Sequence, residues 1–275
     1  MNRNEACGNS GTKLTIGFQL SDGKGFVNFI DVCYNKKTAS TIYTKHTING
    51  KAIKNAMKSN TRPSSFKTAE IPTNIAAATS FTKASQKKRF TIILGSEELA
   101  EEYLNATYLA RGHLAPDGDG LFISWQMATY YYINVVPQWQ SINNANWKSI
   151  EINVRSKAAQ LREDVIIYTG GHQVLKLNNK KMTLESDGLE IPKWSWKILK
   201  NPANDNGIAF VTLNNPFETT VPIPLCEDIC DDYGWNEKNY KTFYKGYTIC
   251  CSVADLMLAI PAIPEAARVT NILRQ

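Results

Sequence analysis

One stretch of the chain, residues 110–155, gathers side chains that could act together on a phosphate ester. It contains Arg111 and His113, although the whole chain has only three histidines. A histidine titrates near neutral pH and can take a proton from water. An arginine fork matches the oxygens of a phosphate. The segment therefore offers a general base beside a phosphate-binding cation.

The second half of this stretch adds oxygen ligands of the kind that a hard divalent cation prefers. From about Ser141 the apolar residues step by three and four, which predicts a helix. Asn143, Trp147 and Glu151 recur at every fourth position and share a face about 80° wide. An amide carbonyl and a carboxylate on one face could hold Mg²⁺ with water in its other positions. An exposed glutamate is the alternative, which the position of Asn143 at the helix start disfavours.

The composition is that of a globular protein with a small excess of positive charge. Hydrophobic residues make up 43% and charged residues 20% of 275, so a sizeable core is available. The net charge of +6 is compatible with a polyanionic partner, but many proteins with such a charge bind no nucleic acid. No apolar run of about 18 residues occurs, so we expect no membrane span.

The six cysteines indicate three disulfides and an oxidising compartment. Four of them lie near the C-terminus, as CEDIC and CC, which lacks the paired spacing of a zinc site. We expect Cys7 to pair with Cys33 and the other four to pair among themselves. Buried free thiols in a cytosolic protein are the alternative.

Residue patterns predict one mixed α+β domain over 1–275, with a central antiparallel-rich sheet flanked by helices. Its active-site core is expected at about 110–155 and a disulfide-rich part at about 222–275. Between residues 54 and 89 we expect loop with a helical portion. Strands are expected over 15–20, 26–34, 41–47, 130–136, 165–169, 193–199 and 208–213, and helices over 96–109, from 141 and over 253–259.

The two remaining histidines are expected to serve structure. His46 lies on an alternating segment, which indicates a surface or strand histidine. His172 follows Gly170 and Gly171, a pair that predicts a turn after the strand over 165–169, so His172 is interpreted as a loop histidine.

Two motifs in the opening stretch resemble those of the DNA/RNA non-specific endonucleases of the ββα-metal superfamily. The first is RGHLAP, residues 111–116, and the second is N-x-x-P-Q-x-x-x-x-N-x-x-x-W-x-x-x-E, from Asn134 to Glu151. Weaker similarity extends to Arg62 and to VIIYTGG. The CYN at Cys33, the RPSSF segment and the CEDIC…CC tail look most like the arthropod secreted branch, which includes insect enzymes that degrade double-stranded RNA. Mitochondrial endonuclease G looks less similar because of the cysteines.

This resemblance implies roles for the residues that match its motifs. His113 would be the general base that deprotonates the attacking water. Asn143 would be the direct Mg²⁺ ligand, with water in the other positions, and Glu151 would orient those waters.

Four further matching residues would support the site. Arg111 would support the phosphate or the geometry of the site, and Asn134 and Gln138 would line it. Arg62, on a looser alignment, resembles an upstream phosphate-binding arginine. Ala110 departs from the family motif, in which an aspartate precedes Arg-Gly-His, and this puts in doubt a direct transfer of rate or pH optimum.

The resemblance therefore implies a secreted, Mg²⁺-dependent endonuclease without sequence specificity, with Mn²⁺ as a substitute metal. It would hydrolyse double-stranded RNA, DNA or both and leave 5′-phosphate ends. A catalytically weak relative that binds nucleic acid is the alternative. Nucleic acid is the implied partner, and no membrane is involved. The N-terminus has no apolar core and is not a signal peptide, so a secreted protein would have lost that segment.

Overall fold

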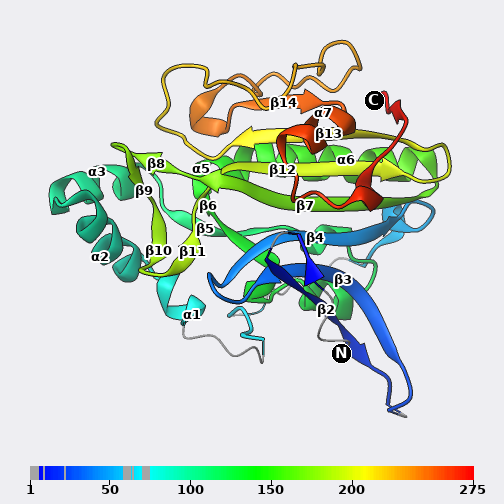
Figure 1. Ribbon diagram of the computed structural model, residues 1–275. Helices are drawn as coiled ribbons and strands as arrows, with labels where there is room; N and C mark the ends of the chain where they lie inside the picture. Colours follow the sequence, from blue (N-terminus) through cyan, green and yellow to red (C-terminus); the bar gives the residue numbers. More distant parts are fainter. Residues whose placement is uncertain (1–5, 9, 22, 58–62, 64, 70–74) are drawn as a thin grey trace.

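A large sheet organises the protein in the computed structural model, which describes residues 6–8, 10–21, 23–57, 63, 65–69 and 75–275 (Figure 1). This nine-stranded sheet has the order β1-β2-β3-β4-β7-β12-β13-β14, and β15 pairs with β13. The pairing of β13 with β15 is parallel, and the others are antiparallel. Its strands are β1 (Ala6–Cys7), β2 (Gly11–Gln19), β3 (Phe26–Asn35), β4 (Ser40–Asn49), β7 (Asp164–Val174), β12 (Pro192–Asn201), β13 (Asn206–Leu213), β14 (Thr248–Cys251) and β15 (Asn271–Ile272).

Three smaller antiparallel ladders accompany this sheet. They pair β5 (Leu109–His113) with β6 (Val135–Trp139), β8 (Lys176–Leu177) with β9 (Lys180–Lys181), and β10 (Thr183–Glu185) with β11 (Gly188–Glu190). The mixed α+β prediction is confirmed, and the expected strands over 15–20 and 26–34 correspond to β2 and β3, which pair antiparallel.

Helix α3 begins at a side-chain N-cap. Ser96 accepts a hydrogen bond from Leu99 N at the start of α3, as expected of an N-cap. No helix in the described ranges is long and apolar enough to cross a membrane. The α-helices are α1 (Ala77–Ser80), α2 (Lys83–Leu94), α3 (Glu97–Ala106), α4 (Ile123–Ala128), α5 (Gln140–Ile142), α6 (Lys148–Leu161) and α7 (Val253–Ala259). The other helical turns are η1 (Ile53–Asn55), η2 (Asp117–Asp119), η3 (Tyr132–Asn134), η4 (Asn143–Trp147), η5 (Phe243–Lys245) and η6 (Glu265–Ala267).

Two helices cover opposite faces of the sheet (Figure 1). Helix α6 buries Ile150, Val154 and Ala158 in a core that includes Leu199 of β12. Helix α7 packs on the other face, in a core that includes Ile198 of the same strand. Because side chains alternate along a strand, Lys197 points with Leu199 toward the α6 face, where the predicted active-site residues lie.

Two segments differ from the sequence prediction. Gly170 and Gly171 do not end the strand, because β7 continues through them to Val174. A Cβ at Gly170 would lie 2.6 Å from the Trp196 ring and 2.4 Å from the Ile42 carbonyl oxygen, so glycine gives β12 and β4 room to pair there. His172 is therefore a strand residue and not a loop residue.

The expected strand over 130–136 is divided. A helical turn, η3, occupies its middle, and the strand β6 begins only at Val135. The Asn134 side chain explains the turn, because its Nδ2 donates to the carbonyls of Thr129 and Ala115, both at 2.8 Å. These bonds hold the chain in a bend that an extended strand would not allow.

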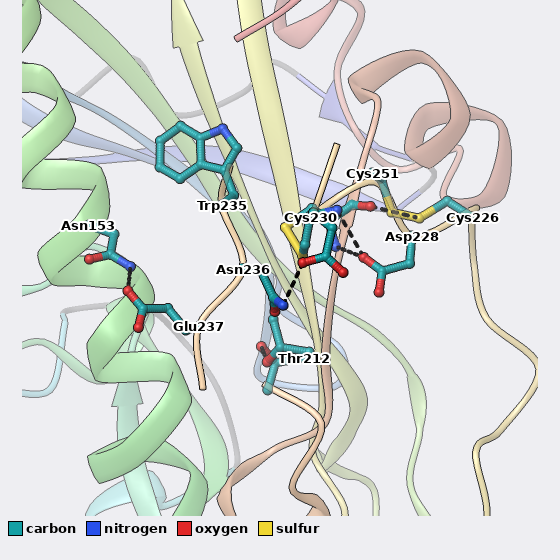
Figure 2. Close-up of a disulfide and its surroundings, with 12 residues drawn as sticks. Asn153, Thr212, Cys226, Asp228, Cys230, Trp235, Asn236, Glu237 and Cys251 are labelled. Atoms are coloured by element: carbon teal, nitrogen blue, oxygen red, sulfur yellow. Dashed lines mark hydrogen bonds between the residues drawn. A yellow bond between two sulfur atoms is a disulfide. The ribbon is translucent and has the colours of Figure 1, made fainter. Parts of the chain in front are cut away.

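The cysteines pair as expected. Cys7 is bonded to Cys33, Cys226 to Cys251, and Cys230 to Cys250. Figure 2 shows Asp228 beside these C-terminal bridges, where its Oδ1 accepts hydrogen bonds from the backbone N of Cys230 and of Cys250. Asp228, Cys230 and Cys250 lie close enough together to suggest a metal site, but disulfide-bonded sulfurs offer no thiolate to a metal. We therefore interpret this cluster as structural.

Candidate active site

A β-hairpin followed by a helix carries the predicted site. In the ladder of β5 and β6, His113 is paired with Val135. The chain beyond His113 is fixed by Asn134, which is 0% exposed and whose Oδ1 accepts from Ala115 N at 3.0 Å. The side-chain hydrogen bonds of Asn134 to described residues all go to backbone groups, so this amide fixes the segment that follows His113.

The imidazole of His113 lies between aromatic rings. Its centroid is 5.2 Å from the ring of Phe66 and 4.9 Å from the ring of Tyr130, the latter edge-on. Such packing restricts the rotation of a half-buried side chain. The imidazole of His113 is therefore held in one orientation against these two rings.

Arg111 is held in a similar way, two residues earlier on the same strand. Its guanidinium carbon lies within 5.4 to 5.7 Å of the ring centroids of Phe66, Phe81 and Tyr132. Its Nε donates to the Tyr132 hydroxyl at 3.3 Å. Arginine stacks on aromatic faces while most of its fork remains available for an oxyanion, so Arg111 keeps donors for a phosphate.

The helix after β6 is interrupted at its start. A π-helical turn at Asn143–Trp147 joins α5 to α6, and Ala145 within it has non-helical angles of φ −112° and ψ −108°. Turns of this kind are frequent at functional sites because they re-aim side chains. Here the turn follows Gln140–Ile142 directly and carries Asn143 at its first position.

Asn143 and Glu151 are half-buried and free of competing bonds. Neither side chain makes a hydrogen bond to the part of the chain that the structure describes. An amide oxygen and a carboxylate that no protein group occupies suit a hydrated hard cation. The donor set of this site therefore fits Mg²⁺ or Mn²⁺.

Burial and nearby charges act on the Glu151 carboxyl. Burial raises its pKa to about 7, the positive charges of Lys197 and Arg155 oppose this rise, and Asp119 and Asp117 add to it. A metal ion would favour the ionised form further, since a nearby positive charge lowers the pKa of a carboxyl. Glu151 is thus held close to its protonation boundary near neutral pH.

A buried ionic network lies beside Glu151. Asp119 accepts from Nε2 of His46 and from the guanidinium of Arg155, both at 2.8 Å. Burial lowers the pKa of His46, against the opposite effect of Asp119. His46 lies on the expected strand, but it is a buried residue of the site's support and not a surface histidine.

The remaining predicted residues are arranged as follows. Gln138 is buried, and its Nε2 donates to Ser195 Oγ at 3.3 Å, while its Oε1 has no hydrogen-bond partner among the described residues. Ala110 lies opposite Gln138 in the β5–β6 ladder. Arg62 lies outside the residues that the structure describes.

Sequence reasoning missed three charged residues at this site. Arg155 follows Glu151 by four positions, so one more step along the helix face would have found it. Asp119 lies in the Gly/Asp-rich loop after His113, and nothing local marks it. Lys197 comes from β12, and only the pairing of distant strands brings it here.

The stability of the metal-free protein should depend on pH through Glu151. The pKa of Glu151 in the folded, metal-free protein is about 7, above the ordinary value of 4.5. The folded state therefore binds more protons than the unfolded state between these values, and the free energy of unfolding falls as pH rises through this window. Glutamine does not titrate, so the free energy of unfolding of Glu151→Gln should lack this fall. Between pH 5 and pH 8 the variant should become about 1–3 kcal/mol more stable relative to wild type, as measured by urea titrations in the presence of a chelator.

Glu102→Gln is the matched control, because it removes an equal charge from an exposed position of α3. Its stability should follow that of wild type at every pH. If the free energy of unfolding of Glu151→Gln changed with pH in parallel with that of wild type, the effect of burial on the pKa of Glu151 would be contradicted.

The β5–β6 ladder and the helix that follows it carry the predicted site residues. The profile of the DNA/RNA non-specific endonuclease family matches residues 9–256, and the chain belongs to this family.

Several salivary proteins resemble the chain. A salivary endonuclease of Lutzomyia longipalpis is 34% identical over 92% of this chain and 62% of that protein. A salivary endonuclease of Culex quinquefasciatus is 30% identical over 97% and 70%, respectively. The salivary protein Tsal1 of Glossina morsitans morsitans is 28% identical over 94% and 66%. The chain thus spans 62–70% of the length of these relatives.

The chain also resembles solved structures. One example, a chain of the EndoG/EndoGI complex, has a TM-score of 0.48 and 17% identity, over 76% of this chain and 78% of that one.

Proposed function

We propose that this chain is a secreted, Mg²⁺-dependent endonuclease that cleaves nucleic acid without sequence specificity. The observation that carries this proposal is a ring-packed His113 on β5 together with Asn143 and Glu151 after β6, two oxygen donors that make no hydrogen bond to a described protein group. Family membership and the three disulfides support it. The salivary relatives and the oxidising chemistry of disulfides support secretion.

The residues divide the hydrolysis among them. His113 takes the proton from the attacking water, and Arg111 places its free donors on the phosphate. Asn143 would bind the metal directly, and Glu151 would orient the metal's water ligands. The metal supplies charge neutralisation on the phosphoryl and leaving oxygens. The products would carry 5′-phosphate and 3′-hydroxyl ends.

The supporting residues keep these groups in place. Asn134 fixes the backbone after His113, and Gln138 links β6 to Ser195 of the central sheet. Phosphate-directed contacts carry no sequence information, so this site favours non-specific cleavage. Duplex RNA and duplex DNA remain the two proposed substrates, distinguished by groove shape and the 2′-hydroxyl.

The test is incubation of the protein with plasmid DNA and with long double-stranded RNA, each with Mg²⁺, with Mn²⁺ or with a chelator. We expect degradation with either metal and none with the chelator. Rates on DNA and RNA duplexes of matched sequence then rank the substrates. Binding without cleavage of either polymer would instead favour the alternative, a catalytically weak nucleic-acid-binding relative.

A further inference from the structure

Lys197 is a buried lysine with no task in the hydrolysis outlined above. It is 1% exposed and lies in the middle of β12, where the sheet faces α6. Lysine is almost never fully buried unless it is paired. Burial lowers the pKa of Lys197 to about 8, against the opposing effect of Glu151 and Asp119. The contacts of the ammonium group should therefore show what stabilises a lysine at this buried position.

Two hydrogen bonds connect the ammonium group to different parts of the site. Nζ donates to the carbonyl oxygen of Leu114 at 3.1 Å. Leu114 directly follows His113, so this bond fixes the backbone beside the base. Nζ also donates to Thr169 Oγ1 at 2.7 Å, and Thr169 is the partner of Lys197 in the pairing of β7 with β12. Lys197 thereby joins the His113 segment to the central sheet.

A third contact reaches the helix that carries Asn143 and Glu151. Nζ lies 5.3 Å from the centroid of the Trp147 ring, a cation–π distance. Trp147 is 1% exposed and ends the turn η4, which begins at Asn143 and leads directly into α6 with Glu151. The same ammonium group therefore contacts the sheet, the segment after the base and the metal-binding helix.

The charges around Glu151 give Lys197 a second effect. Four charged groups act on the Glu151 carboxyl: Lys197 from β12, Arg155 from α6, and Asp119 and Asp117 from η2. Arg155 is bonded to Asp119, which offsets its charge. Lys197 bonds only to neutral oxygens among the described residues, so its charge is not offset by a direct ion pair.

We propose that Lys197 is a positioning residue of the active site. It holds the His113 segment and the Asn143–Glu151 helix at a fixed separation, and it provides the positive charge that the Glu151 carboxylate faces. This inference rests on the proposed function, because a separation of catalytic groups matters only if the site cleaves. It also accounts for a lysine at a fully buried position of β12.

Lys197→Met tests the proposal, because it keeps most of the length of the side chain and removes the charge and both hydrogen bonds. We expect kcat to fall by about 10–100-fold, as for the loss of groups that orient a metal site, with KM for nucleic acid within about threefold. The acidic limb of the kcat–pH profile should move to higher pH, since the charge that favours ionised Glu151 is gone. Lys197→Arg should restore that limb.

Thr169→Val separates the two effects. It removes one acceptor and keeps the charge, so kcat should fall while the acidic limb stays in place. Lys157→Met is the control, because Lys157 is a buried lysine of α6 that is not among the charged groups acting on Glu151. Its kcat–pH profile should match wild type, and thermal melts of all variants report folding.

Wild-type kcat and an unmoved acidic limb in Lys197→Met would overturn the proposal, and so would a loss that only follows the unfolded fraction. If the methionine variant does not fold, Lys197→Arg and Thr169→Val decide. The proposal is supported if Lys197→Arg keeps the acidic limb of the wild-type kcat–pH profile and Thr169→Val has a reduced kcat. An unchanged kcat in Thr169→Val overturns it. Failure of this proposal alone leaves wild-type cleavage and its dependence on His113 intact, whereas failure of the proposed function removes both.

Discussion

His113→Ala should abolish cleavage of both DNA and RNA while the protein remains folded. General-base catalysis contributes about 10²–10⁴-fold to a rate, and in the proposed mechanism no other residue takes the proton from the attacking water. We expect the loss in kcat to lie in the upper part of this range. KM should change little, because the base acts on water and Arg111 still binds the phosphate. The measurement is steady-state cleavage of a fluorogenic duplex at saturating Mg²⁺.

Folding of this variant is the main concern, because the imidazole packs on Phe66 and Tyr130. His113→Gln keeps a flat polar group between the two rings and still lacks the base, so it should be as inactive as the alanine variant. His172→Asn is the matched control, since His172 is a half-buried histidine of β7. Near-wild-type cleavage by both His113 variants would show that the base lies elsewhere.

Local patterns were enough to predict much of the fold. Apolar residues that step by three and four predicted a helix from about Ser141, and α6 buries Ile150, Val154 and Ala158 as that pattern requires. The regular helix begins only at Lys148, after the π-helical turn with its kink at Ala145. Alternating residues predicted the strands that became β2, β3 and β4. Such patterns are visible in a sequence because the period of a helix or strand is fixed by its own backbone.

The features that were missed depend on partners distant in the chain. Gly170 looks like a turn until the Trp196 ring and the Ile42 carbonyl occupy the space that a Cβ would need. Lys197 looks like an exposed charge until its strand pairs with β7 and places it beside Leu114. The bend at Ala145 has no local signal, since neither glycine nor proline is near it. The conformation and burial of these residues depend on tertiary packing, which the periodicity of a sequence does not show.

Asn143→Ala should lose metal binding as well as activity, and this distinguishes a ligand from a base. Losing even a group that only orients a metal ligand costs about 10–100-fold in metal affinity or activity, so losing the ligand itself should cost about 100-fold or more at limiting Mg²⁺. Excess Mg²⁺ or Mn²⁺ should restore part of the rate, because the remaining water ligands and Glu151 still favour a cation. Isothermal titration of the metal-free protein with Mn²⁺ measures the loss of affinity without any need for turnover.

Two further variants make this result specific to the ligand. Asn144→Ala removes the neighbouring amide, which is exposed at the surface, and should bind metal as wild type does. Asn143→Asp retains an oxygen ligand and adds a negative charge, so its affinity for Mn²⁺ should equal or exceed that of wild type. Unchanged Mn²⁺ affinity in Asn143→Ala would remove Asn143 from the metal site. His113→Ala should keep its Mn²⁺ affinity, so the two alanine variants separate the base from the ligand: each loses cleavage, but only Asn143→Ala loses the metal.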